Sequence, residues 1–148
     1  MKDNSIRIAN CSGFYGDKLS IAKDMIEGGP IDVLTGDYLA ELTMTILYNQ
    51  KLKRGEEHGY VGTFLKQFKD VAKLAQEKDI KIVTNAGGLN PSSMAAAVEE
   101  IVQELNLDLK VAYIEGDDLM PRIDELYKGG ETLTNIDKAL DLQNYKEK

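Results

Sequence analysis

Four short stretches of small and polar residues hold the side chains of this sequence that could do chemistry. They are residues 10–13 (Asn-Cys-Ser-Gly), 35–38 (Thr-Gly-Asp-Tyr), 85–88 (Asn-Ala-Gly-Gly) and 115–118 (Glu-Gly-Asp-Asp). Each stretch follows a short apolar run that is typical of a strand, and its glycine lets a ligand approach the backbone closely. Ordinary strand-to-helix turns have the same composition, so turn chemistry remains an equal alternative for any one stretch.

Carboxylates in these stretches are candidates for acid–base chemistry or for binding a hard divalent cation. Asp37 and Glu41 are one helical turn apart, and Glu115, Asp117 and Asp118 follow the fourth apolar run. No spacing among them is diagnostic of a metal site. The residues themselves favour the simpler alternative, in which Asp37 and Asp117 cap helices and the others are solvated.

Two of the stretches precede helices and could bind an anion, because a helix amino terminus offers free N–H groups and a positive dipole. They are residues 12–16 and 87–90, and neither matches a nucleotide-binding glycine motif. We predict that Asp37, Asn85 and Asp117 orient the reacting part of a ligand. The predicted ligand-contacting residues are Ser12, Gly13, Tyr15, Gly36, Tyr38, Gly87, Gly88 and Glu115.

Cys11 and His58 are the only residues of their types. A single cysteine forms no internal disulfide, and it excludes zinc sites built on several thiolates. A small buried thiol is a commoner role for Cys11 than a nucleophile, and His58 lies in a charged segment that is expected at the surface. The residues identify no cofactor and no metal.

Composition narrows the class of protein. The chain has 148 residues, of which 43% are hydrophobic and 29% charged, with a formal net charge of −7. An acidic chain is not expected to bind nucleic acid, because affinity for phosphate comes from clustered Lys and Arg. No apolar run is long enough to span a membrane, and no signal peptide is visible, so we expect a cytoplasmic protein without a membrane partner.

Short apolar runs alternate with amphipathic helical patterns along the chain. Strands joined by helices of this length are normally parallel. The pattern therefore predicts an α/β fold: an open, doubly wound (Rossmann-like), mostly parallel sheet of about four strands with helices on both faces. The predicted strands lie near residues 6–9, 31–34, 80–83 and 109–114, and the helices near 17–27, 38–50, 63–76, 91–105 and 121–127.

Two details of this pattern are specific. The helix that starts near Tyr38 is apolar around much of its circumference, so we expect it to be buried on more than one side. Asn90 and Pro91 are a strong helix start, with Asn as the N-cap and Pro as the first helical residue. We expect residues 1–130 to form one α/β domain and residues 131–148 a polar helical or disordered tail.

The same stretches carry a resemblance to a known family. Residues 8–17, 28–43, 82–91 and 111–118 are similar, in order and in spacing, to amino-terminal motifs of the acyclic terpene utilisation family, AtuA. The resemblance implies a role in bacterial catabolism of citronellol- and geraniol-like terpenes or in related acyl-CoA pathways. Family members continue into further α/β segments, so this chain corresponds to their amino-terminal part: a truncated chain, a short stand-alone version or one subunit of a split protein.

Two functions follow as hypotheses. The first is an enzyme domain that acts on a small carboxylate or acyl-CoA-type metabolite, with the glycine-rich turns holding its anionic part. The alternative is a non-catalytic assembly module, or an incomplete fragment of a longer enzyme, that pairs with itself or with the missing carboxyl-terminal part through an uncovered apolar surface.

Overall fold

The computed structural model describes residues 5–145. The chain divides into two compact units, Met1–Ile114 and Glu115–Lys148. The second unit consists of a 3₁₀ turn η1 (Met120–Arg122), the short helix α5 (Ile123–Lys128) and a second 3₁₀ turn η2 (Leu142–Tyr145). The first unit contains, in chain order, β1 (Ile8–Asn10), α1 (Ile21–Gly28), β2 (Val33–Gly36), α2 (Glu41–Arg54), α3 (Gly62–Glu77), β3 (Lys81–Thr84) and α4 (Pro91–Glu104).

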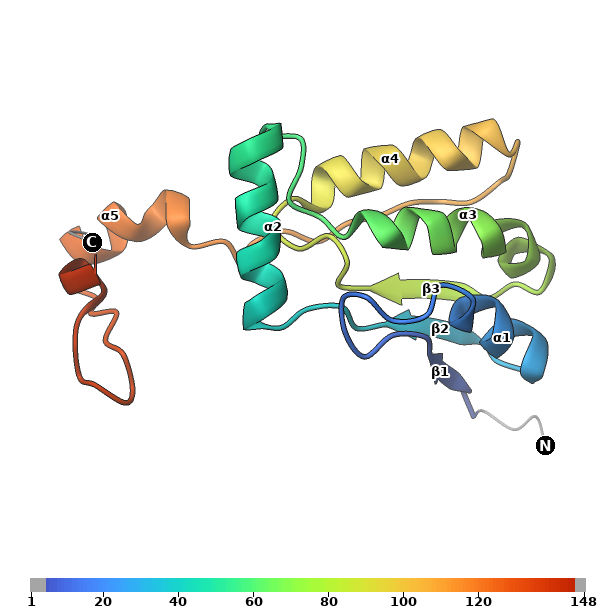
Figure 1. Cartoon of the computed structure of the whole chain (residues 1–148), viewed down its shortest axis with the longest axis horizontal. Helices are drawn as coiled ribbons and strands as arrows, with labels where there is room; N and C mark the ends of the chain where they lie inside the picture. The colour runs from blue at the N-terminus through green and yellow to red at the C-terminus, as the bar shows by residue number, and fades with distance from the viewer. Residues whose placement is uncertain (1–4, 146–148) are drawn as a thin grey trace. The chain divides into compact units, whose positions relative to one another are not determined.

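The three strands form one parallel sheet in the order β1-β2-β3 (Figure 1). Asn10 pairs with Thr35, and Thr35 pairs with Val83. The predicted α/β class and the parallel direction of these strands are confirmed. Because the strands are parallel and in register, their carboxyl ends share one edge of the sheet.

Helices α1 and α3 pack on the same face of this sheet. Leu34 at the centre of β2 is buried with Ile26 of α1 and Val71 of α3. On the opposite face Ile8 is 65% exposed and Val83 is 58% exposed. The predicted doubly wound sheet with helices on both faces is therefore wrong for the described strands. The strands follow one another in the order β1-β2-β3, so right-handed crossovers put both helices on one side, whereas a doubly wound sheet needs a reversal of strand order.

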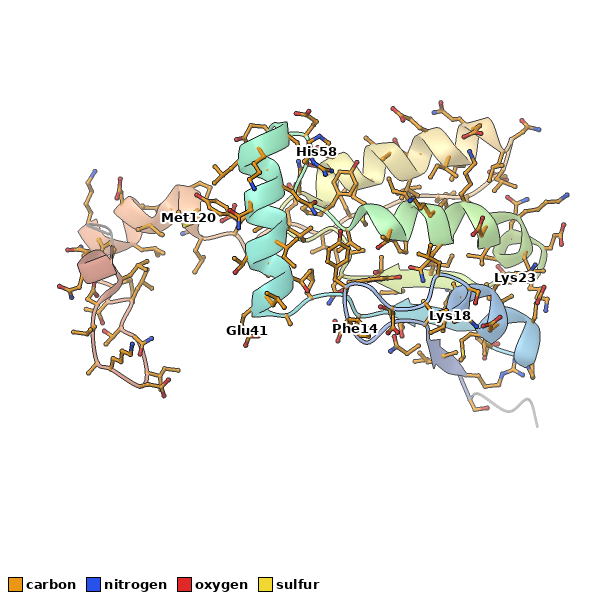
Figure 2. All side chains as sticks on the ribbon, in the orientation of Figure 1. Phe14, Lys18, Lys23, Glu41, His58 and Met120 are labelled. Atoms are coloured by element: carbon orange, nitrogen blue, oxygen red, sulfur yellow. The ribbon has the colours of Figure 1, made fainter. Side chains whose placement is uncertain are left out.

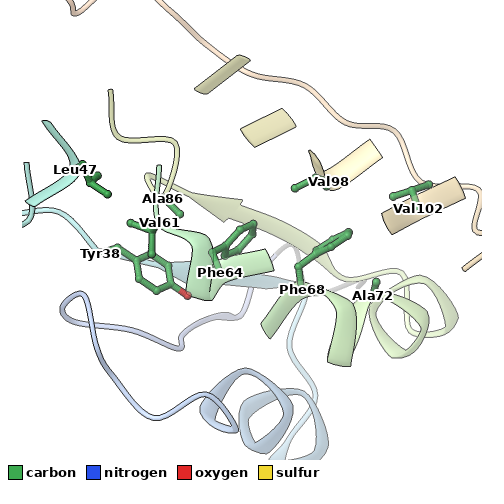
Figure 3. Close-up of a cluster of buried hydrophobic side chains, with 9 residues drawn as sticks. All are labelled: Tyr38, Leu47, Val61, Phe64, Phe68, Ala72, Ala86, Val98 and Val102. Atoms are coloured by element: carbon green, nitrogen blue, oxygen red, sulfur yellow. The ribbon is translucent and has the colours of Figure 1, made fainter. Parts of the chain in front are cut away.

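A second cluster of buried side chains lies where α3 packs against α4 and against Leu47 in the middle of α2 (Figure 3). The rings of Tyr38 and Phe64 meet edge to face, with centroids 6.0 Å apart. The ring of Phe68 stacks on that of Phe64 at 6.1 Å. This aromatic row fixes α3 against the carboxyl end of β2, since buried aromatic pairs add to the stability that their burial provides.

The predicted fourth strand at 109–114 is wrong. Leu109 and Val111 are partly buried against the second cluster, as the alternating pattern requires. Within the described residues, however, the sheet has three strands and this segment belongs to none of them. Just before it, the N–H of Asp108 donates to Oε1 of Gln76 at 2.7 Å, not to a strand. Alternation reports which side chains face the core, but it does not report a hydrogen-bonded neighbour.

The expected burial of α2 on several sides is also wrong. Only Thr43 and Leu47 of this helix are buried, whereas Leu42, Tyr48 and Leu52 are exposed. In contrast, the predicted start of α4 is confirmed: Asn90 Oδ1 accepts from the N–H of Ser93 at 3.1 Å, and Pro91 is the first helical residue. Among the described helices, none has the length and apolar character needed to cross a membrane.

Gly88 has a backbone conformation and a position that only glycine fits. Its φ is +53°, and a Cβ atom there would lie 2.8 Å from the carbonyl oxygen of Gly59 and would overlap Leu47. We expect Gly88→Ala to lower the free energy of unfolding by about 2–4 kcal/mol in urea denaturation. The control is Gly28→Ala, where a Cβ meets no atom within 4 Å, with an expected change below about 1 kcal/mol. Equal effects of the two substitutions would contradict this explanation.

Candidate functional site

The side-chain amide of Asn85 joins the ends of two neighbouring strands. Its Oδ1 accepts from the backbone N–H of Tyr38 at 2.8 Å, and its Nδ2 donates to Oδ1 of Asp37 at 2.7 Å. Asn85 and Asp37 are both exposed, whereas Tyr38 is buried. The Asn85 side chain, which follows β3, thereby holds the Asp37 carboxylate in solvent, and the next residue, Tyr38, points into the core.

The loop after β1 joins this edge through the backbone. The N–H of Asp37 donates to the carbonyl of Ser12 at 3.0 Å, and the N–H of Asn85 donates to that of Gly36 at 3.4 Å. Three of the four polar stretches singled out in the sequence therefore lie together at the carboxyl edge of the sheet. We call this set of loops, residues 10–17, 35–38 and 85–88, the strand-end rim.

Part of the first loop is occupied by the chain's own carboxylate. The N–H of Gly13 donates to Oδ2 of Asp17 at 2.9 Å, and both residues are accessible to solvent. Ser12 is buried and its hydroxyl donates to the carbonyl of Phe14 at 3.0 Å. Tyr15 is partly buried against the second cluster. The first predicted anion-binding turn thus holds a carboxylate, but one from the same chain.

In the second predicted anion-binding turn, the backbone N–H groups donate to carbonyl groups of the turn itself. The N–H of Gly88 donates to the carbonyl of Asn85 at 3.1 Å, and the N–H of Asn90 donates to that of Gly87 at 2.9 Å. A Cβ on Gly87 would lie 2.9 Å from Cα of Pro91, so this glycine allows α4 to start directly above the turn. The geometry gives Gly87 and Gly88 a packing role.

A buried polar cluster beneath the rim contains one predicted ligand-contacting residue, Tyr38, together with Cys11 and with Gln67, which the sequence reasoning missed. The hydroxyl of Tyr38 donates to Oε1 of Gln67 in α3, and it also bonds with the Cys11 side chain. Burial raises the pKa of the Cys11 thiol, and it raises the pKa of the Tyr38 hydroxyl as well. Cys11 is therefore the small buried thiol expected from the sequence, because a nucleophile needs an accessible thiolate.

Gln67 is only 2% exposed, yet its Nε2 has no hydrogen-bond partner. It borders a cavity of about 10 Å³, room for about one water molecule, together with Cys11, Gly36 and Tyr38. A signal for Gln67 exists in the sequence. It lies at helical spacing between Phe64, Phe68 and Val71, so it belongs to the apolar face of α3. The periodicity that places Phe64, Phe68 and Val71 in the core places the polar side chain of Gln67 there as well.

The fourth polar stretch belongs to the second unit. Glu115 and Asp117 are exposed there. Oδ1 of Asp118 accepts from the N–H of Met120 at 2.9 Å, so Asp118 makes the turn contact that the sequence reasoning gave to Asp117. The structure thus brings Ser12, Gly36 and Asp37 together with Asn85, and it places Glu115 and Asp117 in a separate unit.

The part of the chain that the structure describes contains no cluster of side chains arranged as metal ligands. No group of three or more His, Cys, Asp or Glu side chains there is arranged to hold an ion. What the rim offers instead is the exposed carboxylate of Asp37, oriented by the amide of Asn85. Such a group can accept hydrogen bonds or take a proton.

A family model decides the relationship of this chain to known proteins. The model for the acyclic terpene utilisation family protein AtuA matches residues 6–148. The chain belongs to the AtuA family. No curated protein and no solved structure matches it. The AtuA match includes all three loops of the strand-end rim and continues through the second unit, beyond the motifs that carried the resemblance in the sequence.

The Tyr38–Gln67 contact can be tested by a double-mutant cycle. Tyr38→Phe leaves Oε1 of the buried Gln67 without this donor, and Gln67→Met leaves the buried Tyr38 hydroxyl without this acceptor. Each substitution is therefore expected to lower the free energy of unfolding by about 1–3 kcal/mol. The double variant removes both groups, and its loss should be smaller than the sum by about 1 kcal/mol or more. Urea denaturation measures all four proteins. Additive losses would show that the two side chains do not depend on each other.

Proposed function

We propose that the strand-end rim binds the polar end of a small carboxylate or acyl-CoA-type metabolite, in an enzyme of acyclic terpene catabolism or a related pathway. The observation that carries the proposal is the Asp37 carboxylate, held in solvent at the carboxyl edge of a parallel sheet by the amide of Asn85 at 2.7 Å. Ligands of open α/β sheets bind at this edge. Membership of the AtuA family supports the choice of substrate class.

Asp37 acts on the reacting end of the ligand in this proposal. Asn85 holds Oδ1, while Oδ2 accepts from no donor among the described residues. A carboxylate with one oxygen fixed and the other accessible can orient a ligand hydroxyl or remove a proton beside a carbonyl group.

The anionic end of the ligand takes the place of Asp17 in the first loop. The N–H of Gly13 already binds a carboxylate, at 2.9 Å and in contact with solvent. An exchange of one carboxylate for another therefore needs no new donor and little desolvation. Tyr15, two residues further on, is partly buried and supplies an apolar surface for the ligand beside this N–H.

The wider setting of the site belongs to the same proposal. In a Rossmann-like sheet, helices would cover the face near Ile8 and Val83 as well, because parallel sheets are normally covered on both faces. A cytoplasmic location fits the lone reduced cysteine and the acidic composition.

Isothermal titration calorimetry with geranic acid and with the CoA thioester of a branched acyclic acid tests the proposal. We expect Asn85→Ala to weaken binding about tenfold, because it releases the carboxylate of Asp37. Asp17→Ala is expected to strengthen binding several-fold, because it frees the N–H of Gly13. Asp70→Asn, at an exposed position of α3, is the control and should bind like the parent protein.

Two results would reject the proposal: no binding of either compound, or binding that none of the three substitutions alters. The alternative, a non-catalytic assembly module, is favoured by the exposed apolar side chains of the sheet and of α2. This alternative predicts that the chain associates with itself and that neither compound binds to it.

A further inference from the structure

The outer side of α2 carries large apolar side chains in solvent. Leu42 is 72% exposed, Tyr48 55% and Leu52 66%. With about 3.6 residues per turn, these positions fall on one stripe along the helix, with Thr45 and Asn49 between them. We call these five residues the α2 stripe. Apolar residues gathered on one exposed helix face mark an interaction surface.

The stripe lies on the side of α2 that faces away from the first unit. The two buried residues of the helix are Thr43 and Leu47, and helical geometry puts them opposite the middle of the stripe. Leu47 belongs to the second core cluster, next to Tyr38 and Val61 in Figure 3. Figure 1 shows α2 lying crosswise at the end of α3 and α4. The helix is therefore attached along one side and presents the other along its whole length.

The charges of α2 are separated along the helix, with an acidic first turn and a basic last turn, which suits antiparallel pairing with a second copy. Glu41 lies in the first turn, and Lys51, Lys53 and Arg54 lie in the last turn. Figure 2 labels Glu41 at one end of the helix. In an antiparallel pair, the acidic start of each helix lies beside the basic end of the other, and the two helix dipoles oppose each other favourably.

We propose that two copies of this chain associate through their α2 stripes as an antiparallel, two-fold symmetric helix pair. A two-fold axis that crosses the stripe at the level of residue 47 along the helix places Leu42 level with Leu52 of the partner subunit and brings the two Tyr48 rings together at the centre. The contact is isologous, so the apolar positions and the charges match at the same time. This pairing does not depend on the ligand proposed for the strand-end rim.

The size of the surface sets the expected strength. A helix of 14 residues is about 21 Å long. A pair of such helices buries less than the roughly 1,600 Å² of a typical stable interface. We therefore expect a reversible dimer with a dissociation constant on the order of 10–100 µM, centred on the two Tyr48 rings.

Sedimentation velocity of the full chain from about 5 to 500 µM tests the proposal across this range. The parent protein is expected to shift from monomer to dimer, and Leu52→Glu to weaken the dimer at least tenfold. The matched control is Ile136→Glu, because Ile136 is 99% exposed and lies in the second unit. It should associate like the parent protein. Circular dichroism checks that the variants keep their helix content.

Charge reversal tests the antiparallel direction with changes that leave the apolar stripe intact. Glu41→Lys alone is expected to weaken the dimer several-fold, and adding Lys53→Glu is expected to restore part of the loss. A monomer at all concentrations would overturn the proposal, whatever else covers the stripe. So would a dimer that Leu52→Glu leaves unchanged. A dimer that Leu52→Glu disrupts but that Glu41→Lys strengthens would overturn the antiparallel arrangement.

Discussion

The hydrogen bonds of the Asn85 amide are the interaction on which the rest of the rim depends. A carboxamide can donate and accept at once, and here it accepts from the backbone after β2 while it donates to the Asp37 carboxylate. As a result, the two consecutive side chains lie in opposite environments: Asp37 is in solvent and Tyr38 is in the core. Gly36 makes room for this turn, since a Cβ there would lie 2.7 Å from the Tyr38 ring.

Strand order sets a second constraint, on what surrounds the rim. With strands in the order β1-β2-β3, same-handed crossovers bring α1 and α3 to one face and leave Ile8 and Val83 exposed on the other. The buried residues of helix α2 are Thr43 and Leu47, and its outer side carries the exposed Leu42, Tyr48 and Leu52. A chain of the AtuA family that folds in this way has exposed apolar side chains on two surfaces, the open face of the sheet and the outer side of α2.

Local chemistry allowed much of this to be predicted from the sequence. Glycine and Asx residues after short apolar runs predicted the three loops of the rim, and Asn90 with Pro91 predicted the start of α4. Pairing and exposure could not be predicted in the same way. The segment 109–114 alternates like a strand without joining one, and the apolar circumference of α2 does not tell which side packs. The Asp17 carboxylate on Gly13 depends on a loop conformation that has no sequence signature.

We propose that three strand ends form one ligand site organised by Asn85, and ¹⁵N chemical-shift mapping of the full chain during titration with geranic acid tests this most directly. We expect concerted, saturable shifts at Gly13, Asp37 and Tyr38 and at the side-chain amide of Asn85, with the backbone of α4 beyond its first turn unchanged. Saturable shifts confined to other surfaces, with the Asn85 side-chain signals unmoved, would contradict it.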